Sequence, residues 1–249
     1  MSEFIPKGYD HITTESEDGE NSEYILNRES GHHFIITNRS FQTVDHRFSN
    51  FPSKTLDYML KEDGYDDIAV LDIGGGIEAR ASGDIAEQYK NYDDLAIYSL
   101  DLTANPNTRG GRHQIVGDAL EMPIKSNSID IALSTMSVSE VVSGDPELLK
   151  KALLETARVL KPGGVFFLDK VYSKQLEQLP DPDQFAHFEE EMEVVFYTKE
   201  FGFFYGLYET LIQKLNNTYP DWKFLIMVKK PVNEDLIKEL ALQGKNKIV

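Results

Sequence analysis

The residues best suited to chemistry lie in the stretch LDIGGGIEARAS, which spans residues 71–82. Three successive glycines, Gly74, Gly75 and Gly76, follow an apolar run typical of a buried strand. Glycines in such a turn can adopt positive φ and let a ligand approach the backbone. A helix that begins after the turn presents unpaired N–H groups. The stretch therefore predicts a turn that binds a nucleotide-like cofactor.

Two carboxylates decide which cofactor this turn favours. Gly74, Gly76 and Ala79 fit the loose G-x-G-x-x-[GA] pattern of dinucleotide binding. Asp72 and Glu78, however, would place two negative charges near a pyrophosphate. S-adenosylmethionine carries no phosphate, and its sulfonium and ammonium groups are cationic. Because charge-assisted contacts favour opposite charges, the acidic turn favours S-adenosylmethionine.

The elements that must position this turn alternate along the chain from residue 66. The clearest helix is predicted over residues 145–160, where Asp145 can cap it and Pro146 suits its first turn. Strands alternating with helices imply an α/β fold with a doubly wound, mostly parallel sheet and helices on both faces. Apolar, β-branched runs predict its strands over residues 68–73, 95–101, 113–118, 128–135 and 165–172.

Composition divides the remaining chain. Residues 1–30 hold eight acidic and only two basic residues, which predicts a mobile segment. Residues 31–64 are expected to form a helical lid segment, with a helix near 50–64. Residues 65–230 form the expected cofactor-binding domain, and residues 231–249 a C-terminal helix. Within 181–230, the late additions are a helix over 181–195 running toward a strand, a helix over 206–219 and a strand over 222–230.

The formal net charge of −17 makes a nucleic-acid partner unexpected. Binding phosphates requires clustered lysine and arginine. The best basic stretch, residues 109–114, is interpreted as an exposed loop.

The chain has no cysteine, which excludes disulfides, thiolate metal sites and a cysteine nucleophile. His32, His33, Asp45 and His46 have no spacing that fixes a metal site, so no metal is expected. No run approaches the roughly 18 apolar residues that span a bilayer, and no secretory signal is visible. A cytoplasmic protein without a membrane partner is expected.

Three further stretches follow the glycine turn in a fixed order. After VLDIGGGIEA at 70–79 come SLDLT at 99–103, GDALEMPIKSNSIDIALS at 117–134 and LLETARVLKPGGVFFLD at 153–169. Together they resemble the motifs of the class I S-adenosylmethionine-dependent methyltransferases, most closely the type 11-like enzymes that act on small molecules. The resemblance implies a Rossmann-like fold with a seven-stranded sheet.

The resemblance also implies the cofactor, S-adenosylmethionine, its product, S-adenosylhomocysteine, and the residues that bind it. Asp101 matches the acid that holds the ribose hydroxyls, and Asp118 matches the acid that contacts the adenine amino group. The full set of cofactor-binding residues expected is Asp72, Gly74, Gly75, Gly76, Asp101, Leu102, Asp118, Ala119, Leu120 and Ser134.

Methyl transfer from a sulfonium is an in-line displacement, in which the protein mainly aligns the nucleophile and excludes water. A base near the methyl group helps the acceptor lose its proton. The methyl group should project past the ends of the fourth and fifth strands, where Glu140 is expected as base and Tyr172 as the residue that orients the acceptor. The expected acceptor is a small molecule methylated at oxygen or nitrogen; the sequence names neither the acceptor nor the oligomeric state.

Two alternative functions stay open at this point. One is a non-catalytic methyltransferase-like protein that acts on a protein partner through its acidic surface. The other is a dinucleotide-dependent oxidoreductase, which Asp72 disfavours.

Glu78 stands where the family motif has its last glycine. Gly83 disfavours an early helix start, so the helix is expected to begin late with Ser82 as its cap. Glu78 should then face solvent or a cationic neighbour such as Arg80.

This interpretation makes a testable prediction. Glu78→Gly should change S-adenosylmethionine affinity by less than about tenfold, since the carboxylate points away from the ligand. Asp72→Asn should weaken binding more, and isothermal titration measures both variants. Much tighter binding by Glu78→Gly would contradict the interpretation, because it would mean that the carboxylate closes the site.

Overall fold

The structure is a computed structural model of the chain. It describes residues 8–15, 21–29, 33–35, 39–48, 50–62, 65–76, 78–102, 112–135, 137–138, 145–172, 192–195, 222–229 and 235. The helix expected over 206–219 lies outside these residues, as does almost all of the C-terminal helix over 231–249. Of the helix-to-strand segment over 181–195, only its end is described.

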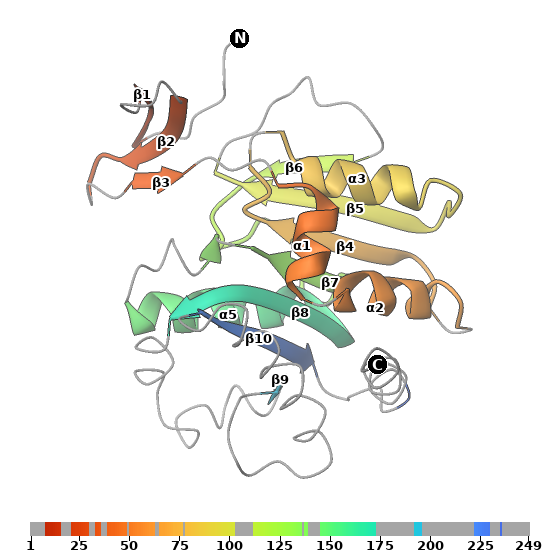
Figure 1. Cartoon of the computed structure of the whole chain (residues 1–249). Helices are drawn as coiled ribbons and strands as arrows, with labels where there is room; N and C mark the ends of the chain where they lie inside the picture. The colour runs from red at the N-terminus through yellow and green to blue at the C-terminus, as the bar shows by residue number, and fades with distance from the viewer. Residues whose placement is uncertain are drawn as a thin grey trace.

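The centre of the fold is a seven-stranded sheet with the order β6-β5-β4-β7-β8-β10-β9 (Figure 1). β10 pairs antiparallel with β8 and β9, and the other pairings are parallel. The order runs outward from β4 in both directions, which confirms the prediction of a doubly wound, mostly parallel sheet. The strands are β4 Ile68–Ile73, β5 Leu95–Asp101, β6 Arg112–Val116, β7 Ile129–Ser134, β8 Leu160–Tyr172, β9 Met192–Val195 and β10 Trp222–Lys229.

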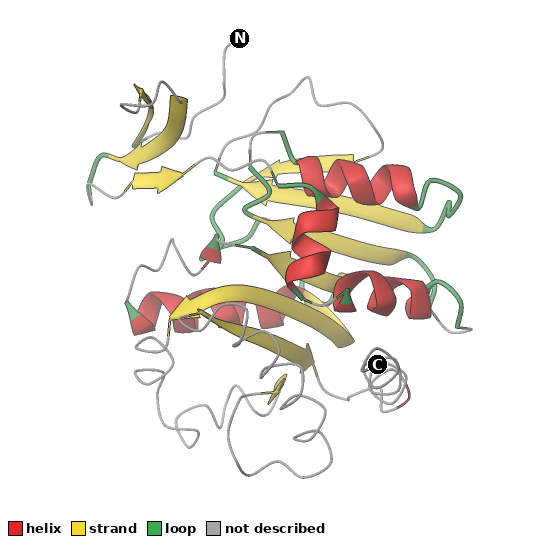
Figure 2. Ribbon diagram, in the orientation of Figure 1, coloured by secondary structure: helices red, strands yellow, loops and turns green. Residues whose placement is uncertain are grey.

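Helices cover both faces of this sheet (Figure 2). Helices α1 Phe41–Arg47, α2 Phe51–Met59 and α3 Arg80–Gln88 pack on one face, and α5 Pro146–Val159 packs on the other. Successive residues of β4 alternate between the two cores, since Ile68 and Val70 face α1–α3 while Ala69 and Leu71 face α5. No helix in the described part of the chain is long and apolar enough to cross a membrane.

The start of α5 agrees with the sequence prediction. The Asp145 carboxylate accepts hydrogen bonds from the backbone N–H groups of Glu147 at 2.9 Å and Leu148 at 3.3 Å. Pro146 occupies the first turn, where no intrahelical N–H bond is lost. The cap stabilises the first turn of α5, and Leu149, Ala152 and Leu153 of this helix pack in the core against the sheet.

The N-terminal region forms two strands that the sequence did not predict. Within residues 1–30, expected to be mobile, the structure places β1 Tyr9–Glu15 and β2 Asn21–Asn27, which pair antiparallel. β3 His33–Ile35 pairs with β2 to complete a separate three-stranded sheet. Arg28, just after β2, forms an ion pair with Asp10 in β1. The acidic composition did not indicate these strands, in which strand-favouring threonine and isoleucine residues of β1 meet a partner strand.

One buried ring contact attaches the α1–α2 corner to the sheet. Phe48, at the end of α1, is fully buried, and its ring centroid lies 5.5 Å from that of Phe167 in β8. Phe48→Ala should lower the free energy of unfolding by about 3–5 kcal/mol, because it leaves a cavity between helix and sheet. Urea denaturation measures the change.

Leu154→Ala is the matched control for this prediction. The Leu154 side chain is 43% exposed on α5, so its truncation should change stability by about 0.5 kcal/mol or less. Equal losses in the two variants would contradict the packing role of Phe48.

Candidate cofactor-binding site

The glycine turn lies between β4 and α3, at the carboxyl end of the central strand. Gly74 and Gly76 have φ of +73° and +74°, a backbone region that other L-residues rarely adopt. A Cβ added at Gly75 would lie 2.7 Å from the Asp72 carboxylate. Each of the three positions therefore requires glycine, for φ at two of them and for space at the third.

The N–H groups of this turn are bound to the end of the neighbouring strand. Gly74 N donates to the Leu100 carbonyl at 2.6 Å, and Gly75 N approaches the same oxygen at 3.4 Å. Gly76 N donates to Asp101 Oδ2 at 2.9 Å. A pyrophosphate bound in the usual way would need such N–H groups for itself. The geometry therefore disfavours a dinucleotide, in agreement with the charge argument.

Asp101 is the last residue of β5, and its side chain is half-buried beside the turn. Its backbone carbonyl accepts a hydrogen bond from Gly117 N at 2.9 Å. That bond brings the end of β5 together with the start of the segment after β6. The structure thus places Asp101 and Asp118 at adjacent strand ends, as parallel neighbours in a sheet require. Leu102 follows Asp101 and is also half-buried.

Asp118 opens a tight turn. Its Oδ1 accepts a hydrogen bond from Leu120 N at 2.8 Å, and its backbone carbonyl accepts one from Glu121 N at 3.1 Å. Ala119 and Leu120 are half-buried and pack against the core on the α5 side. In the described part of the chain no residue donates to Oδ2 of Asp118, so this oxygen is available to a ligand.

Asp72 is buried beneath the glycine turn, with only 5% of its surface exposed. Burial raises the pKa of its carboxyl to about 7; the Ser82 hydroxyl, which donates to Oδ2 at 3.4 Å, partly offsets this. The nearby Asp101 charge also raises the pKa, while Arg39 lowers it. Asp72 therefore packs beneath the glycine turn, and its protonation state depends on the charges of its neighbours Asp101 and Arg39.

Ser82 corrects the expected helix start. The structure begins α3 at Arg80, with Ala79 at the cap position in the left-handed region and no side-chain cap. Ser82 lies inside the helix because its hydroxyl turns inward to the buried Asp72. Glu78 is exposed, which confirms the prediction that it faces solvent.

Of the three residues expected near the fourth and fifth strands, the structure describes the side chain of Ser134 alone. Ser134 is fully buried, and its hydroxyl accepts a hydrogen bond from Val138 N at 3.1 Å, so its side chain holds the turn after β7. Tyr172 is the last residue of β8, and its side chain lies outside the described part. Glu140 also lies outside the described residues.

Sequence reasoning missed two arginines at this edge of the sheet. The Arg47 guanidinium in α1 pairs with Asp169 in β8 at 2.9 Å, and the Asp169 side chain is fully buried. Arg39, just before α1, donates to the Thr135 carbonyl after β7. These partners lie 122 and 96 residues apart, so no local spacing could have indicated them.

Comparisons with known proteins match part of the chain to a protein family. Residues 71–168 match the family model described as a methyltransferase domain. That span holds the glycine turn, Asp101 and Asp118. No curated protein matches the chain.

Several solved structures are similar in outline. An S-adenosylmethionine-dependent methyltransferase from Methanosarcina mazei is 19% identical, covers 68% of this chain and 94% of its own, and has a TM-score of 0.38. Phosphoethanolamine N-methyltransferase 2 from Haemonchus contortus, solved with phosphomonomethylethanolamine and S-adenosylhomocysteine, is 14% identical, with coverages of 88% and 70% and a TM-score of 0.38. The [4+2]-cyclase SpnF is 15% identical, with coverages of 80% and 98% and a TM-score of 0.38.

The buried Asp72 predicts a pH dependence of stability without cofactor. Its pKa is raised from 3.8 to about 7 in the folded protein, so the folded state binds this proton more tightly than the unfolded state. The stabilisation is full below the unfolded pKa and is lost as the pH rises toward 7. As the pH rises from about 4 to 7, the free energy of unfolding of Asp72→Asn should therefore fall less than that of the natural chain.

Urea denaturation at a series of pH values measures this difference. Other acids titrate in both proteins, so the difference between the two profiles isolates Asp72. Parallel profiles would show that Asp72 ionises normally in the folded chain.

Proposed function

We propose that this chain is a class I S-adenosylmethionine-dependent methyltransferase, which the match of residues 71–168 to the methyltransferase-domain model supports, and that it transfers the methyl group to an oxygen or nitrogen of a small-molecule acceptor. The observation that carries the proposal is the closure of the glycine turn on the end of β5. Gly76 N donates a hydrogen bond to Asp101 Oδ2. This N–H group is therefore not directed at a phosphate, and carboxylates lie beside the turn. Such a site suits a cationic, phosphate-free cofactor.

The described residues fit the cofactor at several points. Asp101 would hold the ribose hydroxyls, and Oδ2 of Asp118 would accept from the adenine amino group. When bound, S-adenosylmethionine supplies an electrophilic methyl group on its sulfonium. Asp72 lies under the turn, where a nearby cation would favour its ionised form and lower its pKa from about 7.

The acceptor side of the proposal depends on charge and on α1. A net charge of −17 opposes a polyanionic acceptor. Arg39 and Arg47 attach the start and end of α1 to the carboxyl ends of β7 and β8. The segment 39–48 would therefore border the opening through which a small acceptor enters. Glu140 would act as the base, and Tyr172 would orient the acceptor.

Removing the Asp101 carboxylate tests the cofactor assignment. Asp101→Ala should weaken S-adenosylmethionine and S-adenosylhomocysteine binding by about 1–3 kcal/mol, through lost charged hydrogen bonds. Isothermal titration measures this. Asp94→Ala removes an exposed acid just before the same strand and should leave affinity unchanged. No heat from the natural chain at millimolar ligand would end the proposal.

Methyl-labelled S-adenosylmethionine tests the acceptor class. Incubation with a cell extract should label a small-molecule fraction, and that label should depend on Asp101. Label in bulk RNA or DNA instead would show that the charge argument is wrong.

A further inference from the structure

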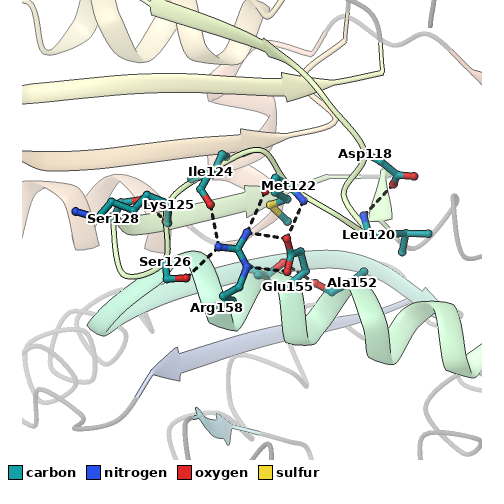
Figure 3. A network of polar contacts seen from close by, with 11 residues as sticks. Asp118, Leu120, Met122, Ile124, Lys125, Ser126, Ser128, Ala152, Glu155 and Arg158 are labelled. Atoms are coloured by element: carbon teal, nitrogen blue, oxygen red, sulfur yellow. Dashed lines mark hydrogen bonds and ion pairs between the residues drawn. The ribbon is translucent and has the colours of Figure 1, made fainter. Parts of the chain in front are cut away.

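Arg158, near the end of α5, donates hydrogen bonds to the loop between β6 and β7 (Figure 3). Its Nη1 donates to the Ile124 carbonyl at 2.8 Å and to the Ser126 hydroxyl at 3.0 Å. Its Nη2 donates to the Met122 carbonyl at 3.0 Å. A guanidinium has five N–H donors in a fixed fork, and three of them are committed to this loop.

Glu155, one turn earlier on α5, takes the other two donors. Its Oε1 and Oε2 accept from Arg158 Nη2 at 2.7 Å and Nε at 2.8 Å. Oε1 also accepts from Met122 N at 2.8 Å, and the Arg158 hydrogen bond lowers the pKa of Glu155. Met122 is thus held through both its N–H and its carbonyl by one ion pair, called the clamp below.

The segment that the clamp holds begins at Asp118. Only three residues separate Asp118 from Met122, and a hydrogen bond from Glu121 N to the Asp118 carbonyl, 3.1 Å, closes the turn between them. A Cβ added at Gly117 would lie 2.7 Å from Pro123 Cδ, so the chain folds tightly back on itself. Met122 is 3% exposed. Movement of Met122 would therefore be transmitted to Asp118.

The clamp lies away from the glycine turn and from Asp101. No described contact joins Glu155 or Arg158 to those residues. Its effect on the cofactor should therefore be local, confined to the group that Asp118 meets.

We propose that Glu155 and Arg158 are positioning residues that set the specificity of the site for adenine, by holding the 118–122 turn so that Asp118 Oδ2 meets the amino group. This rests on the proposed function, since it requires that the chain bind S-adenosylmethionine. A side chain that only stabilised the fold would weaken all ligands alike. A positioning residue changes the choice between ligands that differ at the amino group.

The experiment compares S-adenosylhomocysteine with S-inosylhomocysteine, in which an oxygen replaces that amino group. The full-length chain should bind the adenosyl ligand about tenfold or more tightly than the inosyl ligand, because the carboxylate then faces an acceptor instead of a donor. Arg158→Lys keeps the charge but has only three donors for five acceptors. In this variant the preference should fall about threefold or more, with the loss mainly in adenosyl affinity.

Lys161→Met is the matched control. Lys161 pairs with Asp130 at 2.8 Å, at the opposite end of the strands, so its loss should leave the preference unchanged. Glu155→Gln gives a second test, because it removes the charge opposite Arg158 and should reduce the preference in the same direction.

The outcomes separate the two proposals. If the natural chain binds neither ligand, the proposed function itself fails. If it binds both but without preference, or if Arg158→Lys and Glu155→Gln weaken both ligands equally, the positioning role is overturned while the proposed function stands. Should Arg158→Lys be unfolded by circular dichroism, the Glu155→Gln ratio alone decides.

Discussion

The site depends on one constraint, the attachment of the Gly74–Gly76 turn to the carboxyl end of β5. Gly74 N donates to the Leu100 carbonyl, and Gly76 N donates to the Asp101 carboxylate. These two hydrogen bonds hold the turn against the end of β5. Parallel pairing of β4 with β5 and of β5 with β6 brings their ends to the same edge. The glycine turn, Asp101 and Asp118 therefore lie at the same edge of the sheet.

Charge is distributed differently at the two edges of the sheet. At the amino edge, Asp130 is neutralised by Lys161 and accepts from Ala69 N, and the buried Lys229 donates to Asn127 Oδ1 and the Ala157 carbonyl. At the carboxyl edge, Asp72 lies buried near Asp101 with its pKa raised. Burial and a neighbouring acid both disfavour the ionised form of a carboxyl. Burial and the Asp101 charge thus raise the pKa of Asp72 at the edge where the cofactor would bind, while Ser82 and Arg39 oppose the shift.

The N-terminal helices connect this edge to the rest of the fold. Asp84 of α3 accepts a hydrogen bond from Phe41 N at the start of α1, while Arg47 at its end reaches the buried Asp169. α1 is therefore fixed to the helix that follows the glycine turn and to the strand that ends in Tyr172. A movement of α1 would therefore displace its contacts with both α3 and β8.

The sequence by itself predicted the order of strands and helices from residue 66 to residue 172 and the glycine turn after β4. Both follow from local patterns, namely apolar β-branched runs, the Asp145–Pro146 helix start, and glycines where φ is positive. The exposure of Glu78 could also be predicted, because it depends on the chain entering a helix within a few residues. Composition predicted a mobile segment over residues 1–30 and did not indicate the strand pair Tyr9–Glu15 and Asn21–Asn27.

Only the tertiary structure decided which distant groups meet. Ser82 looked like a helix cap, but it is turned inward by an acid ten residues away. The pairs Arg47–Asp169 and Lys161–Asp130 join strand and helix ends far apart in the chain, and the Arg158 fork reaches a loop more than thirty residues earlier. Sequence spacing specifies contacts within one element, whereas contacts between elements depend on how the sheet brings their ends together.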